Sequence, residues 1–435
     1  MDLAALYARH VTRLQQETAR ALAETGFSSL VVSSGAPHTY FADDQDAPFH
    51  ATPHFSHWCP LGGPHHLLHV VPGSRPRLVR HAPEDYWYEQ GGVTEGFWLP
   101  AFAFEEAGSL EAAWKALGRP ARAAYVGNET ERALAAGLEP NPPALVARLD
   151  WTRSYKDDYE VACLEQATVL GARGHVAART AFAAGASEIE VHHAFVQAVG
   201  VPEAALPYPT IVATDEKGAT LHYESTRSLR DRRVLLLDAG AQSHGYACDI
   251  TRTTPAAGCD PRFVELVRQV DALEQGLVRS ARPGRRYLDV HVQAHREVAR
   301  VLCELGILRV RSDEAFDEGL THPFLPHGIG HHLGIQVHDV AGKQQDPQGT
   351  PAPPPAEYPY LRNTRTVEPG HVFTIEPGIY FIPMLLKPFR GGRKAASFDW
   401  DLIDALAPLG GVRVEDNVLV LEAGARNLTR EQLPS

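Results

Sequence analysis

The sequence of 435 residues lacks the features that mark secreted, disulfide-bonded and membrane-spanning proteins. Its longest apolar runs, such as residues 234–237, fall far short of the roughly 20 residues needed to cross a bilayer. We expect no secretory signal, because Met1, Asp2 and Leu3 begin neither a basic region nor an apolar segment. The five cysteines are odd in number and form no C-x-x-C pair, so we expect a reducing, cytoplasmic location.

Basic residues are also in short supply. Asp and Glu number 53 against 41 Lys and Arg, which leaves a net charge of −12. We therefore expect neither nucleic acid nor a membrane surface as a partner. Apolar residues make up 44% of the chain, which is sufficient for a large core and excludes the disordered and collagen-like classes.

The first 155 residues are predicted to form a small α/β domain. Apolar periodicity and turn residues predict a long helix that ends at Gly26, a buried strand, a hairpin and a short helix. These elements are expected at 2–25, 29–33, 66–71 with 76–80, and directly after Asn128, which would cap the short helix.

The remaining residues, 156–435, are predicted to form a larger α+β domain. Helices followed by strands, rather than strict alternation, favour a mostly antiparallel sheet. A capping box at 187–190 opens one of the helices. Helices are expected at 157–184, 187–199, 261–282 and 287–305, strands within 233–254, 334–339, 371–381 and 411–421, and a proline-rich loop at 340–370.

A pair of aspartates is the first candidate functional feature. Asp238 ends an apolar run, and Asp249 follows eleven residues later. A hairpin that turns at Ser243 and His244 would place the two carboxylates directly opposite each other, about 5 Å apart. Carboxylates that close repel each other unless a cation lies between them, so the pair indicates either exposed acids or a metal site.

The chain contains 22 histidines, and four of them lie within the twelve residues 327–338. Three glycines in this segment argue against a helix and suit a backbone that bends tightly around a site. The alternative is a glycine-rich loop with surface histidines, which would rarely carry four of them. The cluster of His327, His331, His332 and His338 is therefore a candidate for metal binding or proton transfer.

Two glutamates lie within apolar strands further along the chain. Glu376 stands in T-I-E-P-G and Glu415 in R-V-E-D-N, where Arg413 and Glu415 would share one face. A buried glutamate must be paired, protonated or metal-bound. Four carboxylates with an imidazole suit a pair of hard or borderline divalent ions better than structural zinc. Such a pair can hold a bridging hydroxide and polarise a carbonyl.

The order of these motifs resembles the pita-bread metallopeptidases, which include methionine aminopeptidases, aminopeptidase P and prolidases. Further similar segments bring the sequence closest to the bacterial Xaa-Pro dipeptidases over nearly the whole chain. Those segments are residues 41–44, 48–49, 221–223, 358–362 and 398–400. The resemblance implies an α+β fold, with a C-terminal pita-bread domain of residues 156–435 and a smaller N-terminal α/β domain of residues 1–155.

The resemblance also implies a role for each matching residue. The metal ligands would be Asp238, Asp249, His331, Glu376 and Glu415. Glu376 would act as general acid and base, and His338 and His222 would contact the substrate and stabilise the tetrahedral intermediate. His327 and Tyr208 would line the substrate pocket, and Arg362 would bind the substrate carboxylate. Arg413 would orient the ligands. Asp44 would reach the pocket from the partner subunit of a homodimer.

By this resemblance the chain is an enzyme that cleaves Xaa-Pro dipeptides into an amino acid and proline. Two divalent ions are implied, with manganese favoured and cobalt, zinc or iron as alternatives. The Xaa-Pro bond is a tertiary amide of restricted shape, so a dedicated pocket suits it. Two departures from the family pattern, His332 and the segment 215–217, touch no implied ligand.

Two alternatives within the enzyme class stay open at the level of the sequence, and two others are disfavoured. The site could serve an aminopeptidase P-like enzyme or an organophosphate-triester hydrolase on the same fold. A metal-free peptide-binding module or a creatinase-like enzyme is disfavoured, because all five ligand types are present. The loop 340–370 and the segment around Asp44 are the features expected to exclude longer peptides.

Overall fold

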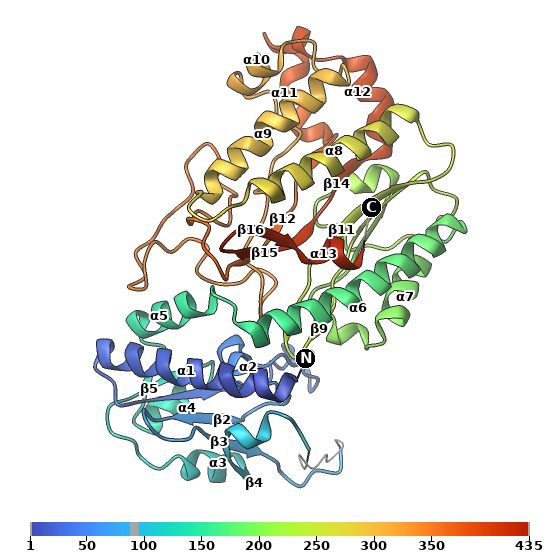
Figure 1. Ribbon diagram of the computed structural model, residues 1–435. Helices are drawn as coiled ribbons and strands as arrows, with labels where there is room; N and C mark the ends of the chain where they lie inside the picture. Colours follow the sequence, from blue (N-terminus) through green and yellow to red (C-terminus); the bar gives the residue numbers. More distant parts are fainter. Residues whose placement is uncertain (1, 88–94, 434–435) are drawn as a thin grey trace. The chain divides into compact units, whose positions relative to one another are not determined.

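The computed structural model describes residues 2–87 and 95–433 (Figure 1). The chain gathers into two compact units, residues 1–163 with 346–350 and residues 164–345 with 351–435. We refer to them as the N-terminal and the C-terminal unit and describe each by itself. No helix among the described residues combines the length and apolarity needed to span a membrane.

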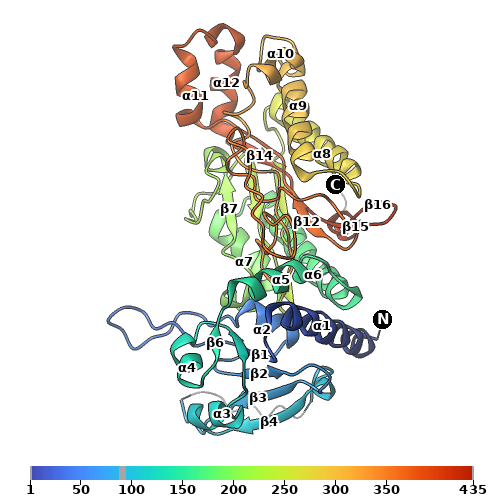
Figure 2. The same cartoon turned by 90° about the vertical axis from the view of Figure 1, so that its left-hand side faces the viewer.

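The N-terminal unit is built on a six-stranded mixed sheet. Its elements are α1 (Leu3–Thr25), β1 (Ser29–Ser33), α2 (Pro53–Trp58), β2 (Leu67–Val70), β3 (Arg77–His81), β4 (Ala103–Ala107), α3 (Leu110–Ala116), β5 (Ala123–Val126), α4 (Thr130–Ala135), β6 (Glu139–Pro140) and α5 (Pro143–Arg153). The strand order is β4-β3-β2-β1-β5-β6. Helix α1 lies on one face of this sheet and α3 on the other (Figures 1 and 2), so every residue of β1 is buried.

Local sequence signals account for most of this unit. Asp2 accepts hydrogen bonds from the first turn of α1, and Gly26 ends the helix with a φ of 81°, as predicted. The predicted hairpin is confirmed by the antiparallel pairing of β2 with β3. The predicted cap of α4 is wrong, because Glu129 occupies that position. Asn128 instead accepts a hydrogen bond from the backbone of Ala36.

The C-terminal unit combines long helices with several small antiparallel sheets. Its helices are α6 (Asp158–Ala183, whose first turns belong to the N-terminal unit), α7 (Glu188–Val199), α8 (Pro261–Ser280), α9 (Tyr287–Glu304), α10 (Ser312–Asp317), α11 (Pro383–Arg390), α12 (Trp400–Leu406) and α13 (Leu428–Gln432). Its strands are β7 (Ile211–Thr214), β8 (Val234–Asp238), β9 (Gln242–Ser243), β10 (Tyr246–Ala247), β11 (Thr251–Pro255), β12 (Val372–Ile375), β13 (Gly378–Tyr380), β14 (Gly411–Arg413), β15 (Asp416–Leu421) and β16 (Gly424–Asn427).

The sheets of this unit carry the segments that sequence analysis singled out. Strands β11-β8-β7 and β12-β15-β16 form three-stranded sheets, and β13 pairs with β14. Helices α8 and α9 pack side by side (Figures 1 and 2). Their apolar faces meet Phe373, Ile375 and Val418 of the strands in one continuous core. The predicted α+β class with antiparallel sheets is therefore confirmed.

Two predictions for this unit are wrong. Residues 334–338 form bends rather than a strand and residue 339 has no regular structure, because this segment carries the glycine and histidine residues that wrap around the site described below. The four short helices α10 to α13 were not expected. Each has fewer than nine residues, which is too short for a helical repeat of apolar residues to stand out.

Candidate active site

Asp238 and Asp249 lie on one hairpin and share one face of it. The residue opposite Asp238 is Thr251, so the predicted direct opposition of the two aspartates is wrong. Both carboxylates are nevertheless close to one group, because the hydroxyl of Tyr208 lies 3.0 Å from Asp238 Oδ1 and 2.5 Å from Asp249 Oδ1. The predicted shared face is thus right.

The turn of the hairpin explains the shifted register. His244 and Gly245 both have positive φ, 51° and 87°, and Ser243 pairs with Tyr246. Two residues of positive φ make the mirror-image turn that suits a two-residue hairpin. The turn therefore lies one residue later than predicted, which shifts the pairing by two residues. A shift of two preserves the face on which each side chain lies.

His331 lies next to β12 because Gly330 lets the chain approach that strand closely. Gly330 has a φ of 150°, and a Cβ there would lie 2.0 Å from the carbonyl oxygen of Thr374. Backbone hydrogen bonds then run from Thr374 to His331 and from Glu376 to Ile329, each 2.9 Å long. His331 Nδ1 lies 3.0 Å from the carbonyl oxygen of His332, to which it can donate. That contact leaves Nε2 turned toward the acids.

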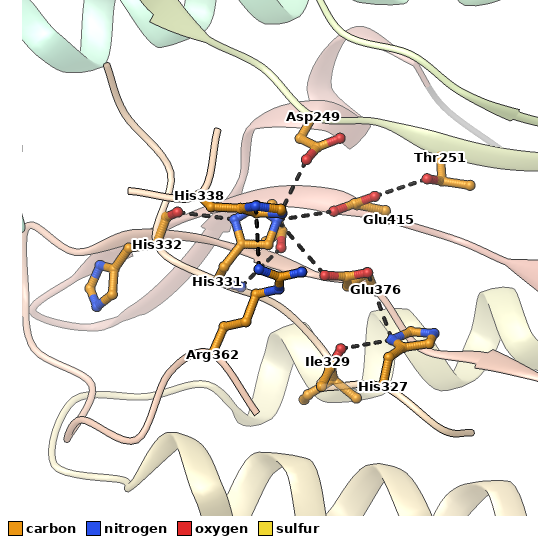
Figure 3. Close-up of polar contacts among 12 residues, drawn as sticks. Asp249, Thr251, His327, Ile329, His331, His332, His338, Arg362, Glu376 and Glu415 are labelled. Atoms are coloured by element: carbon orange, nitrogen blue, oxygen red, sulfur yellow. Dashed lines mark hydrogen bonds and ion pairs between the residues drawn. The ribbon is translucent and has the colours of Figure 1, made fainter. Parts of the chain in front are cut away.

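Three carboxylates surround this imidazole (Figure 3). His331 Nε2 lies 3.5 Å from Asp249 Oδ2, 3.8 Å from Glu376 Oε1 and 3.9 Å from Glu415 Oε1. The described residues Asp249, His331 and Glu415 each offer a ligand atom, and these atoms lie within 4.8 Å of one another. Thr251 donates to Glu415 Oε2 at 2.8 Å, while Glu415 Oε1 is buried without a hydrogen-bond partner among the described residues.

Asp238 is held by an arginine. Arg413 Nη2 lies 2.6 Å from Asp238 Oδ2, and its other nitrogens reach Tyr380 and Thr251 at 3.1 and 3.3 Å. As predicted, Arg413 and Glu415 point to the same side of their strand, since both line the cleft described below. One arginine thus compensates part of the charge of four acids.

The pKa values of these acids reflect the negative charge that Arg413 leaves uncompensated. Burial raises the pKa of Glu376 to about 7. Burial, followed by the charge of Asp249, raises the pKa of Glu415 well above its usual value. Burial would raise the pKa of Asp249 as well, but the hydrogen bond and charge of His331 and the hydroxyl of Tyr208 together hold that pKa low. Acids this crowded favour a cation among them.

A cleft of about 500 Å³ opens above these residues. It is lined by most of the predicted substrate residues, namely His222, His327, His338, Arg362 and Arg413. Arg362 Nη1 lies 3.4 Å from His338 Nδ1, and the rings of His338 and His331 are 4.3 Å apart in an edge-on arrangement. Burial lowers the pKa of His338 to about 3 and that of His327 to about 4, so both rings are uncharged at neutral pH.

Other predicted residues lie apart from the cleft lining. Tyr208 contacts the two aspartates from behind, as described above, and Asp44 is an exposed residue of the N-terminal unit. The structure also brings in residues that sequence reasoning missed. Tyr380 joins Arg413 to His327 through its hydroxyl, at 3.1 and 2.9 Å, and Met384 and Leu385 of α11 form an apolar rim. The periodicity Glu376, Gly378, Tyr380 could have pointed to Tyr380.

The fold and the site together define a class of protein. Buried carboxylates around one imidazole, beside a cleft with uncharged histidines and an arginine, are the donor set of a metal-dependent hydrolase. Among solved structures, proline aminopeptidase P II from Yersinia pestis matches 99% of this chain and 97% of its own with a TM-score of 0.73. At 23% identity, this likeness identifies the pita-bread fold alone.

Sequence comparison gives the family. Residues 162–422 match the profile "Metallopeptidase family M24", and residues 5–151 match "Xaa-Pro dipeptidase, N-terminal domain". The chain is 42% identical to the Xaa-Pro dipeptidase of Aeromonas hydrophila over 98% of both chains. It is also 42% identical to that of Stenotrophomonas maltophilia, over 99% of this chain and 97% of the relative. The chain belongs to metallopeptidase family M24, in its Xaa-Pro dipeptidase branch.

Proposed function

We propose that this protein hydrolyses Xaa-Pro dipeptides to a free amino acid and proline. The observation that carries the proposal is the joint placement of Asp249, His331 and Glu415 beside a cleft of about 500 Å³. A cleft of that size suits a dipeptide, and His338 with Arg362 offers it neutral and cationic hydrogen-bond donors. The family assignment supports the same substrate.

We further propose that five residues hold two divalent ions: Asp238, Asp249, His331, Glu376 and Glu415. The donor set fits such ions, because it is rich in oxygen, contains one imidazole and has a buried carboxylate oxygen, Glu415 Oε1, with no hydrogen-bond partner among the described residues. Manganese is the ion we favour, with cobalt, zinc or iron as alternatives. Bound ions would lower the pKa of a water molecule and polarise the scissile carbonyl.

In this proposal the residues of the cleft divide the chemistry between them. Glu376 takes the proton from the attacking water and delivers it to the leaving proline nitrogen, a role open to a carboxylate that lies beside the other proposed ligands. His338 and His222 donate hydrogen bonds to the carbonyl oxygen as it gains charge. Arg362 binds the substrate carboxylate, His327 and Tyr208 shape the pocket, and Arg413 orients Asp238.

The N-terminal domain, residues 1–155 by sequence, has a proposed role of its own. We propose that it mediates a homodimer in the cytoplasm and that Asp44 reaches the site of the partner subunit. A carboxylate there would recognise the amino group of the dipeptide. Gel filtration with light scattering checks the dimer, and an Asp44→Asn variant should raise KM while leaving kcat nearly unchanged.

The test is proline release from Xaa-Pro dipeptides and Xaa-Pro-Yaa tripeptides with added Mn²⁺. We expect cleavage of dipeptides only, abolished by a chelator and restored by Mn²⁺. A Glu376→Gln variant should lose about 100-fold or more in kcat, while Glu422→Gln, an exposed control, should not. Cleavage of tripeptides would instead assign an aminopeptidase P-like activity, and hydrolysis of organophosphate triesters alone would overturn the dipeptidase proposal.

A further inference from the structure

A second cavity of about 300 Å³ lies in the C-terminal unit, next to the cleft described above. The two share Pro326, His327, Gly328 and Tyr360 in their walls, while the remaining lining of the second cavity is its own. Besides the shared His327, three histidines line it: His291, His295 and His322. None of the three has a role in the proposed function.

The three rings form a chain around Tyr358. His291 and His295 lie one turn apart on α9, which places both side chains on the same face of the helix. Their ring centres are 4.8 Å apart, and those of His295 and His322 are 5.0 Å apart. Imidazoles bound to one tetrahedral ion have ring centres roughly 5 Å apart, given metal–nitrogen bonds of about 2.0 Å. The spacing of these rings therefore suits a shared ion.

The hydrogen bonds of these imidazoles leave ring nitrogens available to bind a ligand. His295 Nδ1 lies 2.9 Å from Thr321 Oγ1, a contact that fixes its ring and leaves Nε2 for another partner. His291 is only 1% exposed, yet its Nδ1 has no hydrogen-bond partner in the described parts of the chain. A buried polar nitrogen without a partner is costly, so a ligand in the cavity would relieve that cost.

We propose that His291, His295 and His322 form a binding site for one borderline divalent ion, such as Zn²⁺ or Cu²⁺, separate from the carboxylate-rich active site. Three imidazoles select such ions, whereas oxygen-rich sites suit Mn²⁺. The carboxylate of Glu357, which also lines the cavity, can supply a fourth ligand and a compensating charge.

Binding requires one local movement. The ligand nitrogens of the three rings do not all lie within 4.8 Å of one another in this conformation. His322 is half-buried and lies in the segment that follows α10, so its ring can turn toward the other two. Burial keeps His291 and His295 uncharged at neutral pH, which is the form that binds metal. A site built this way shares a wall, His327, with the active site.

The test counts ions on the whole protein and identifies their ligands. Mn²⁺-loaded protein is titrated with Zn²⁺ against a chromophoric chelator, and Cu²⁺-loaded protein is examined by electron paramagnetic resonance. We expect wild type to bind one more tight Zn²⁺ than His322→Ala, and Cu²⁺ to show splitting from more than one imidazole nitrogen. The active-site cleft holds other imidazoles beside His331, among them His338, so the spectrum is compared with that of His322→Ala, which should lose the splitting from the second cavity.

Matched variants keep the test decisive. His193→Ala removes an exposed histidine of α7 and should leave the Zn²⁺ count unchanged. His295→Phe keeps an aromatic ring against Tyr358 and should lose the same ion as His322→Ala. The proposal is overturned if wild type and His322→Ala bind equal numbers of Zn²⁺, or if every bound Cu²⁺ shows one nitrogen only. Neither readout depends on dipeptidase activity.

Discussion

At the scale of the single residue, the amide of Asn417 fixes the backbone of a proposed ligand without lining the cleft. Asn417 is fully buried, and its Oδ1 accepts a hydrogen bond of 3.1 Å from the backbone N–H of Asp249. The backbone N–H of Asn417 itself donates to Thr429 Oγ1 at 2.9 Å. Helix α13, β15 and the segment carrying Asp249 are thereby tied together at one residue, through its backbone and its side chain.

We predict that Asn417→Ala weakens Mn²⁺ binding by about 10- to 100-fold, because Asp249 loses its fixed position. The free energy of unfolding should also fall by about 1–3 kcal/mol. Asn141→Ala is the matched control, since its amide also bridges backbone groups, at Gly127 in the N-terminal unit. That variant should lose stability but no metal affinity. Equal metal affinity in wild type and Asn417→Ala would contradict the assigned role.

At the scale of the element, an ion network joins α8, α13 and β15 behind the site. Arg430 of α13 contacts Asp271 and Glu274 of α8 and Asp416 of β15, at 2.6, 3.3 and 2.7 Å. Arg252 of β11 reaches Asp416 at 2.7 Å and donates to the carbonyl oxygen of Glu415 at 2.9 Å. The network therefore couples helix packing to the backbone of a proposed ligand.

Glu274 gives this network a pH dependence. Burial, followed by the charge of Asp416, raises the pKa of Glu274 well above its usual value. The native state thus keeps a proton that the unfolded state releases, so stability falls as pH rises above the ordinary pKa. We predict that Glu274→Gln gains stability relative to wild type between pH 5 and pH 8, by up to about 1.4 kcal/mol per pH unit. Urea unfolding at several pH values measures this difference in stability. The control Glu265→Gln, on the exposed side of α8, should show no gain that grows with pH.

A second ion network joins helices α1, α2 and the start of α6. Its contribution to stability depends on pH in the opposite direction. Burial alone would raise the pKa of Glu160, but Arg13 at 2.6 Å and His57 at 3.3 Å hold it well below its usual value. The stabilisation is therefore present above the ordinary glutamate pKa and is lost as pH falls below it.

Glu160→Gln should lower the free energy of unfolding by about 3–5 kcal/mol at pH 7, because Arg13 and His57 lose their buried partner. The difference from wild type should shrink steadily below about pH 4.5. Tryptophan fluorescence follows the transition, and Glu17→Gln on α1 serves as a control with a partly exposed ion pair. A difference that stays constant down to pH 3 would contradict the assignment.

Long elements were predictable from the sequence, whereas exact pairings were not. The apolar stripe of α1 and the capping box of α7 are local signals, and both elements form as predicted. The pairing of Asp238 with Thr251 depends on which two residues adopt positive φ, and the sequence offers His244 with either neighbour. Tyr380 and Asn417 escaped notice because their partners are distant in sequence.

At the scale of the whole molecule, the two units have separate cores. Val31, Leu67 and Tyr125 belong to the core of the N-terminal unit, whereas Phe263, Val290 and Phe373 belong to that of the C-terminal unit. The proposed metal ligands all lie in the C-terminal unit. An ion that binds the native state alone stabilises the unit that holds it, by about 2.7 kcal/mol at a hundredfold excess over Kd.

We predict that Mn²⁺ raises the melting temperature of the C-terminal unit and that a chelator reverses the effect. Five of the six tryptophans lie in the N-terminal unit, so their fluorescence reports on it. Far-ultraviolet circular dichroism reports on helices of both units. We expect Mn²⁺ to shift a circular dichroism transition while the fluorescence transition stays in place. A common shift would show that the two units unfold as one.

The turn at His244 and Gly245 also limits how this gene can change over time. An insertion there that slipped the pairing by one residue would move Asp249 to the opposite face of its strand, away from Asp238. Most surface turns tolerate such insertions because no side chain depends on their length. Here the register set by a half-buried turn is tied to the chemistry several residues away. Related sequences should therefore vary in the composition of this turn while they keep the pairing that holds both aspartates on one face.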